Sequence, residues 1–213
     1  MTAALLQSVF DGSAPELVPI KVDQYHRMIT DGILPEGAAI ELIDGFLVKK
    51  DRGSNRAGDF GVVRNSRHAG IVAHLQILLN QALANSGFHV RSQLPVTLDH
   101  VQEPEPDLAV VRGAARDYLS KHPGPADIAL IIEVADSSLK FDRGVKYRLY
   151  ASASIQSYWI VNLLDETIES YSDPDPVQQC FAVDDVQNRE GTLTVTTGTG
   201  EPIVLAVGEL LPV

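Results

Sequence analysis

Two uninterrupted aliphatic runs, Leu108–Val111 and Ile128–Ile132, stand out in the hydrophobic pattern of the chain. Continuous apolar runs of this length are typical of strands that are buried on both faces. We therefore expect strands over Glu103–Val111 and Ile128–Val134. From Ser66 to Leu83, by contrast, apolar residues recur at steps of three and four, which is the pattern of an amphipathic helix.

Weaker patterns predict the remaining elements. An Asp-Gly pair between two apolar stretches favours a primed two-residue turn, and so a hairpin over Ile40–Val48. The other expected elements are helices over Val22–Asp31 and Asp142–Ala153, strands over Phe88–Leu98, Ser157–Asn162 and Thr167–Tyr171, and a closing hairpin formed by Leu193–Thr197 and Ile203–Ala206. This alternation indicates a single α/β domain. Residues 1–18 lack periodicity and are expected to form an N-terminal arm, which leaves 19–213 as the folded domain.

Two acidic residues, Asp107 and Glu133, lie on the apolar runs. An unpaired carboxylate in such a strand is costly, because burial of an isolated charge is strongly disfavoured. Two of them predict neighbouring strands that hold a divalent metal between them. Lys146 follows on a predicted helix. A hard cation such as Mg²⁺ prefers oxygen ligands, and a nearby lysine can orient the attacking water or stabilise developing negative charge, so this set fits metal-dependent phosphodiester hydrolysis.

Composition bears on the size of the core, on cysteine chemistry and on the cellular compartment. With 213 residues and 45% hydrophobic content, the chain can bury one sizeable core. Its one cysteine, Cys180, excludes an internal disulfide framework and a cysteine or zinc site of the usual spacing. No signal peptide and no apolar run of membrane-spanning length is evident, so we expect a cytoplasmic protein.

The charge distribution bears on the partner. A net charge of −11 argues against attraction of DNA by the chain as a whole. Lysine and arginine nevertheless gather in two clusters, Lys49–Arg67 and Lys140–Arg148, on either side of the suspected site in the sequence. Either cluster alone is typical of a solvated surface. Together they favour local contacts with DNA.

Several short motifs resemble one known family. They are Glu41-Leu-Ile-Asp-Gly, the helix that opens with His68, Gln93-Leu-Pro-Val, Glu105-Pro-Asp-Leu-Ala-Val-Val, Ile132-Glu-Val-Ala-Asp-Ser-Ser-Leu, Phe141-Asp-Arg-Gly-Val-Lys, Leu149-Tyr-Ala and Tyr158-Trp-Ile-Val. Taken together, they resemble the Uma-type endonuclease family of the restriction-endonuclease-like, or PD-(D/E)xK, superfamily. The resemblance covers roughly residues 20 to 211.

The resemblance implies a mixed central β-sheet flanked by helices and a Mg²⁺-dependent DNA endonuclease, with Mn²⁺ as a substitute metal. It implies that Asp107, Glu133 and the main-chain carbonyl of Val134 bind the metal. Ala135 occupies the position of the superfamily's lysine, and Lys146 matches a lysine that has moved to the following helix. Symmetric cleavage of duplex DNA would call for a homodimer.

Other readings stay open at this stage. Glu41 is either an additional metal ligand or a hydrogen-bond partner. His68, which starts the inward face of its helix, is either structural or a water-binding group. Gln93 contacts either the scissile phosphate or the waters of the metal. Glu133 could instead pair structurally with Lys146. The rival function is a non-catalytic regulatory or DNA-binding protein that keeps the nuclease fold.

Overall fold

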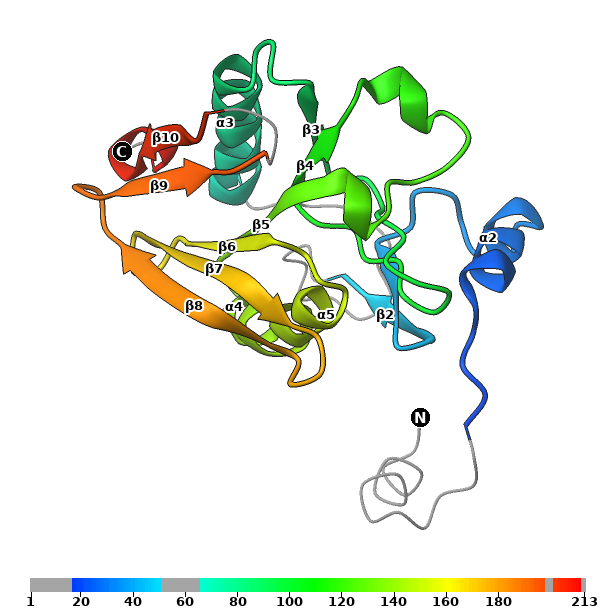
Figure 1. The fold of residues 1–213 in the computed structure, drawn as a ribbon. Coiled ribbons are helices and arrows are strands. Elements are labelled where there is room, and N and C mark those ends of the chain that lie inside the picture. The colour runs from blue at the N-terminus through cyan, green and yellow to red at the C-terminus, as the bar shows by residue number, and fades with distance from the viewer. Residues whose placement is uncertain (1–16, 51–65, 198–200, 212–213) are drawn as a thin grey trace.

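The computed structural model describes residues 17–50, 66–197 and 201–211. Its centre is a six-stranded sheet in the order β3-β4-β5-β6-β7-β8, shown in Figure 1. The strands are β3 (Phe88–Ser92), β4 (Leu108–Arg112), β5 (Ile128–Ala135), β6 (Ser157–Asn162), β7 (Thr167–Asp175) and β8 (Cys180–Gln187). Only the β5–β6 pair is parallel. A parallel pair needs a crossover, and here the crossover is helical. The predicted mixed α/β fold is confirmed.

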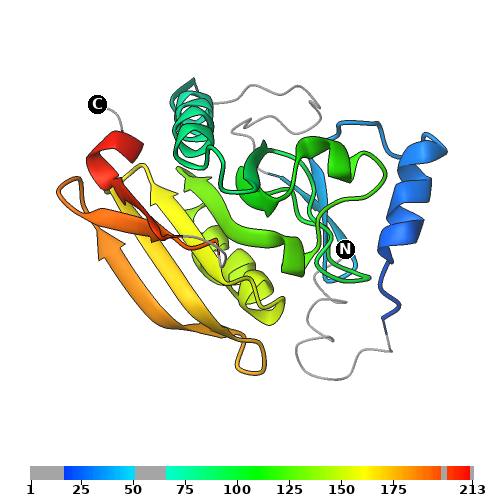
Figure 2. The same cartoon turned by 45° about the horizontal axis from the view of Figure 1, so that its top comes forward.

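Helices cover the two faces of the sheet, so the central strands are buried on both sides. Helix α3 (Ser66–Ala82) packs on one face through Ile71, Leu75 and Leu79, together with alternate residues of β5. The crossover covers the other face. It consists of α4 (Leu139–Phe141), a π-helical turn η3 (Asp142–Lys146) and α5 (Tyr147–Ser152). Figure 2 shows α3 and this crossover on opposite sides of the sheet. Successive side chains along a central strand therefore point alternately into two apolar layers.

Besides the 3₁₀ turns η1 (Ala115–Tyr118) and η2 (Pro125–Asp127), two hairpins and two short helices complete the described chain. They are β1 (Ile40–Ile43) with β2 (Phe46–Lys49), β9 (Thr192–Val195) with β10 (Ile203–Ala206), α2 (Val22–Thr30) and α6 (Val207–Leu210). The β1–β2 turn has positive φ at both Asp44 (51°) and Gly45 (69°), as a primed turn requires. Leu42 forms a bridge with Glu103, so this hairpin lies beside the segment that leads into β4.

Two predicted strands are shorter than expected. The strand that starts at Phe88 ends at Ser92, because Gln93 has a φ of 52° that a strand cannot continue. The strand predicted from Glu103 begins only at Leu108, because Pro104 and Pro106 have no N–H to donate to a ladder.

Strand β8 was not predicted, and the crossover is not a single α-helix. Most of β8 is exposed and its apolar residues are interrupted by Asp184 and Asp185, so it lacks the apolar signal of a buried strand. Residues 1–16 of the N-terminal arm and most of the Lys49–Arg67 cluster lie outside the described residues. Within the described ranges, no helix is both long and apolar enough to cross a membrane.

Candidate functional site

Asp107 and Glu133 meet where β4 begins beside β5. Leu108 pairs with Ile132, so the preceding residue Asp107 lies next to Glu133. The N–H of Asp107 donates to Glu133 Oε2 at 3.2 Å, and the N–H of Val134 donates to Asp107 Oδ2 at 2.9 Å. Both acids are buried. These two reciprocal hydrogen bonds fix both carboxylates at the same point of the sheet edge.

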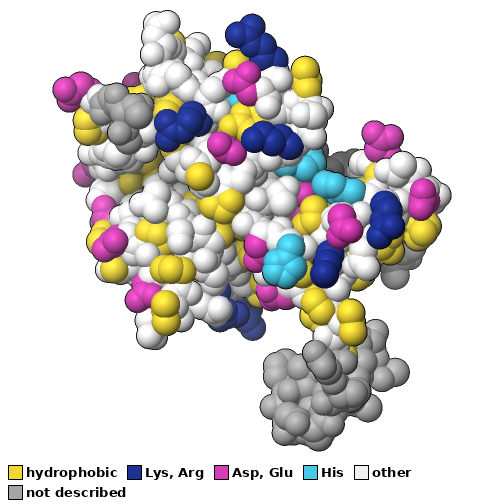
Figure 3. Space-filling view, turned by 45° about the vertical axis from the view of Figure 1, so that its right-hand side comes forward, with side chains coloured by type: hydrophobic (Ala, Val, Ile, Leu, Met, Phe, Trp, Pro, Cys, Tyr) yellow, Lys and Arg dark blue, Asp and Glu magenta, His cyan; other side chains and the backbone are white. Residues whose placement is uncertain are grey.

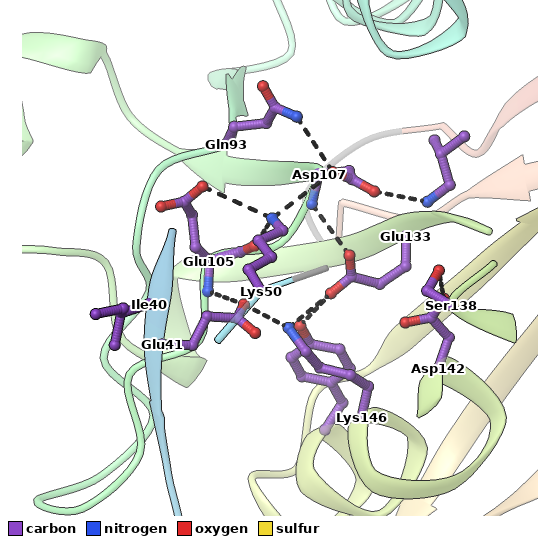
Figure 4. Close-up of polar contacts among 12 residues, drawn as sticks. Ile40, Glu41, Lys50, Gln93, Glu105, Asp107, Glu133, Ser138, Asp142 and Lys146 are labelled. Carbon is purple, nitrogen blue, oxygen red and sulfur yellow. Dashed lines mark hydrogen bonds and ion pairs between the residues drawn. The ribbon is translucent and has the colours of Figure 1, made fainter. Parts of the chain in front are cut away.

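Lys146 reaches Glu133 from the crossover, as Figure 4 shows. Its Nζ lies 2.7 Å from Glu41 Oε1 and 3.2 Å from Glu133 Oε1. Burial alone would lower the pKa of Lys146, but the negative charges of Glu133 and Glu41 outweigh burial and raise it. Lys146 is therefore a buried ammonium ion.

Glu41 holds the position of Lys146 and is itself held by the main chain. Its Oε1 accepts the N–H of Glu105 at 2.7 Å as well as the ammonium of Lys146. Glu41 is thus a hydrogen-bond partner of Lys146 and of the main chain at Glu105. Four residues after Lys146, the hydroxyl of Tyr150 donates to Glu133 Oε1 at 2.7 Å. Burial and the charge of Glu133 raise the pKa of Tyr150, so its hydroxyl stays a donor.

Three donors surround Oδ1 of Asp107 on its other side. His68 Nε2 lies 3.3 Å away, Gln93 Nε2 3.3 Å and Lys50 Nζ 3.7 Å. Burial would raise the pKa of Asp107, but the charge of Lys50 and the hydrogen bond from His68 outweigh it and hold the pKa well below its usual range. Asp107 is ionised at neutral pH.

The environment of Glu133 acts in the opposite direction. Burial raises the pKa of Glu133, and the nearby negative charges of Asp107 and Glu41 raise it further, while Lys146 opposes the shift. The two central carboxylates thus differ: neighbouring cations outweigh burial at Asp107, whereas burial, with repulsion from Asp107 and Glu41, outweighs the cations at Glu133. A positive ion placed between them would favour the ionised form of Glu133.

His68 connects α3 to the same site. Burial would lower the pKa of His68, but its hydrogen bond and charge interaction with Asp107 outweigh burial and raise it. A hydrogen bond with the main chain of Val134 raises it further. His68 therefore bridges Asp107 and Val134, the residue whose carbonyl was expected to bind metal.

Lys50 was missed as a member of the site, because the sequence grouped it with the basic cluster that follows it. The signal was the hairpin register. Ile40 pairs with Lys49, and the N–H of Lys50 donates to the carbonyl of Ala39. This pairing places Lys50 on the side of β1 that carries Glu41. Lys50 Nζ also hydrogen-bonds the main-chain oxygen of Glu105.

The second basic cluster does not form one cationic surface. Lys146 is buried, and Arg143 forms two hydrogen bonds with Glu169, at 2.9 and 2.7 Å. Lys140 and Arg148 remain exposed. The members of the Lys140–Arg148 cluster are thus divided between core, ion pair and surface, and contact of this cluster with DNA stays a prediction.

A groove of about 970 Å³ lies elsewhere, on the sheet face that carries Trp159. Phe88, Ser170 and Thr194 are among its lining residues, and the lining includes neither Asp107 nor Glu133. In β6, Trp159 packs with the α3 layer and Ile160 with the crossover layer. Ile160 is the partner of Glu133 in the β5–β6 ladder. The carboxylates and the groove consequently face different layers.

Fold and site together define a nuclease-like α/β protein, and comparison with known proteins supplies the family. Residues 22–200 match the Uma2 family, described as "Putative restriction endonuclease". The chain belongs to this family, so the resemblance seen in its motifs is confirmed. None of the curated proteins matches the chain.

A solved structure shares the fold. It is the crystal structure of a protein from Anabaena variabilis ATCC 29413 described as "a putative nuclease belonging to DUF820". The two superpose with a TM-score of 0.64 at 16% identity, over 91% of this chain and 98% of the other. At this identity the likeness establishes the architecture, which the two proteins share over nearly their whole lengths.

Proposed function

We propose that this protein is a metal-dependent endonuclease that hydrolyses phosphodiester bonds of DNA. The observation that carries the proposal is the burial of the Lys146 ammonium between Glu41 and Glu133, beside Asp107 at the meeting of β4 and β5. Membership of the Uma2 family supports the same chemistry. In this proposal Asp107, Glu133 and Lys146 are the catalytic residues.

The donor set fits a hard divalent cation. Asp107 and Glu133 offer carboxylate oxygens, which Mg²⁺ prefers, and Mg²⁺ typically needs only one or two carboxylates because it keeps several waters. The raised pKa of Glu133 reflects burial and repulsion from neighbouring acids, which a cation would relieve. Asp107, Glu133 and the carbonyl of Val134 would hold the ion, and Mn²⁺ could replace Mg²⁺. When bound, the ion supplies Lewis-acid activation and charge neutralisation.

The residues of the chain divide the remaining work. Because its pKa is raised, Lys146 acts as a fixed positive charge that stabilises the negative charge developing on the phosphoryl group, and not as a general base. Glu41 positions Lys146. Gln93 and His68, which both approach Asp107 Oδ1, are placed to orient a water or a phosphate oxygen near that carboxylate.

One observation favours the non-catalytic rival. Lys50 places an ammonium 3.7 Å from both Asp107 Oδ1 and Glu105 Oε1, so a side chain already supplies positive charge beside the proposed metal ligands. Together with the net charge of −11, this arrangement suits a protein that keeps the fold without turnover. The two proposals differ in metal binding. The endonuclease must bind Mn²⁺ beside Lys50, whereas the non-catalytic protein need not bind it.

Calorimetric titration with Mn²⁺ separates the roles. Asp107→Asn and Glu133→Gln should each weaken Mn²⁺ binding by more than tenfold (on the order of 1.4 kcal/mol or more). Lys146→Met should leave it nearly intact, because Lys146 is not a ligand. Lys121→Met, which changes an exposed lysine, is the matched control. If wild-type protein binds no Mn²⁺, the metal-dependent proposal is wrong and the rival stands.

A further inference from the structure

A second cluster of possible ligands lies away from the proposed nuclease site. His26 on α2, Glu103 before β4 and His122 before β5 each offer one ligand atom, and these atoms all lie within 4.8 Å of one another. His26 and Glu103 are 77 residues apart in the sequence. Figure 3 shows histidine side chains at the surface of the face that carries α2. The fold therefore gathers two imidazoles and one carboxylate from three separate segments.

The carboxylate at the centre of the cluster is fixed in place. Glu103 has a side chain that is only 1% exposed, and its Oε1 lies 2.6 Å from His26 Nε2. Its other oxygen, Oε2, accepts the hydroxyl of Thr97 at 2.7 Å. The N–H of Thr97 in turn donates to the carbonyl of Pro123, next to His122. A carboxylate that is oriented by a second hydrogen bond is the arrangement that supports metal ligands in proteins.

His122 gives an independent sign that a ligand is needed. Its Nδ1 is buried and has no hydrogen-bond partner among the described residues. Burying a polar atom without a partner carries a desolvation cost of about 1–3 kcal/mol, so native structures rarely leave one in this state. The ring of His122 lies edge-on to the ring of His26, with their centroids 5.8 Å apart.

We propose that His26, Glu103 and His122 form a zinc-binding site distinct from the Asp107–Glu133 centre. Two imidazole nitrogens and one carboxylate oxygen are a ligand set typical of Zn²⁺, and they leave the fourth tetrahedral position for water. On binding, Zn²⁺ would replace the proton in the hydrogen bond between His26 and Glu103, and that proton would be released to solvent. The side chain of His26 is 45% exposed, which gives the ion a route from solvent.

The site would tie α2 to the segment that carries the proposed nuclease residues. Glu103 pairs with Leu42, the residue after Glu41, and lies two residues before Glu105. Zinc would therefore brace this region without contacting the nuclease carboxylates. The two sites also differ in chemistry, because nitrogen ligands favour Zn²⁺ whereas an all-oxygen set favours Mg²⁺.

Titration of chelator-treated protein with Zn²⁺ tests the proposal. Wild-type protein should bind one zinc ion per chain, and zinc should raise the melting temperature, because a ligand that binds only the native state stabilises it. Co²⁺, used as a spectroscopic substitute, should show the absorption of a tetrahedral site. Excess Mg²⁺ should displace neither ion.

Variants locate the bound ion. His26→Ala and His122→Ala should each weaken zinc binding by more than about tenfold, since even the loss of a group that only supports a ligand costs 10–100-fold. His100→Ala, which removes an exposed histidine, is the matched control, and Asp107→Asn should also bind zinc normally. His26 lies at the surface, so its replacement should leave the fold intact by circular dichroism. Equal zinc binding by His26→Ala and His100→Ala, or no binding by wild type, would overturn the proposal.

Discussion

Lys146 Nζ lies 2.7 Å from Glu41 Oε1, although 105 residues separate them in the sequence. This contact joins the β1–β2 hairpin to the crossover between β5 and β6. Both side chains are buried, so neither charge has bulk water to stabilise it. The proposed site therefore forms only when the hairpin and the crossover have both docked on the sheet.

The buried pair predicts a large loss of stability when one partner is removed. Lys146→Met should lower the free energy of unfolding by about 3–5 kcal/mol, because it leaves the charges of Glu41 and Glu133 without their cation. Glu41→Gln in the Lys146→Met background should restore part of this loss. Urea denaturation measures both.

The exposed pair formed by Asp23 and Arg27 on α2 is the control for that experiment. Replacing Asp23 with Asn should change the free energy of unfolding by less than about 1 kcal/mol, since exposed ion pairs contribute little. If Lys146→Met lost as little stability as Asp23→Asn, that result would contradict the structural coupling of Lys146 to Glu41 and Glu133.

Asp142 predicts a specific pH dependence. Burial, and then the charge of Glu133, raises the pKa of Asp142 from 3.8 to about 7. Between these values the folded chain holds a proton that the unfolded chain has released, so this group's contribution to the free energy of unfolding falls as pH rises through that window. Asp142→Asn removes this dependence and keeps an acceptor for Ser138 Oγ.

The measurement is the stability difference between Asp142→Asn and wild type at pH 5 and pH 8. The free energy of unfolding of the variant, relative to that of wild type, should be higher at pH 8 than at pH 5. At the higher pH, wild-type Asp142 must either be ionised while buried or hold its proton at a cost in free energy. A difference that does not change with pH would show that Asp142 titrates normally.

The central part of the site could be predicted because its acids interrupt aliphatic runs. Asp107 and Glu133 each adjoin residues that must be buried. Because burying an unpaired carboxylate is costly, their positions predicted a positively charged partner. Lys50 could not be recognised in this way. The β1–β2 register sets the side of the hairpin on which Lys50 lies, but its approach to Asp107 also depends on the bridge between Leu42 and Glu103, which is a tertiary contact without a local pattern.

The same distinction holds for the fold. The buried strands were predicted from uninterrupted apolar runs and α3 from its apolar periodicity, whereas β8, exposed along most of its length, had neither pattern. The π-helical turn Asp142–Lys146 also left no signal in the sequence, yet it carries Lys146. Secondary structure was predicted best where the apolar residues that adjoin a position in the sequence require its burial.

His68 provides a spectroscopic test of its contact with Asp107. The hydrogen bond and charge of Asp107 raise the pKa of His68 against the effect of burial. In Asp107→Asn the charge is lost while burial remains, so the pKa of His68 should fall below its wild-type value. Titration of the ring by NMR measures the shift, with His74 as an internal reference. An unchanged pKa would rule out the interaction in solution.

The salt dependence of DNA binding tests the basic segment Lys49–Arg67. Each phosphate contact contributes about −0.9 to the slope of log affinity against log salt on duplex DNA. Replacing Arg52, Arg56, Arg64 and Arg67 with Ala should flatten this slope in the presence of Ca²⁺. Arg143→Ala should leave the slope unchanged, because Arg143 is paired with Glu169. The reverse result would place the DNA on the other cluster.

Cleavage of supercoiled plasmid DNA tests the central claim most directly. Wild-type protein should nick or linearise the plasmid with Mg²⁺ or Mn²⁺ and not with EDTA. Asp107→Asn should be inactive, whereas the control Lys121→Met should cleave as wild type does. Cleavage that persists in EDTA or in Asp107→Asn, or a wild-type protein that binds DNA and Mn²⁺ without cutting, would contradict the assignment of Asp107, Glu133 and Lys146 as a metal-dependent nuclease centre.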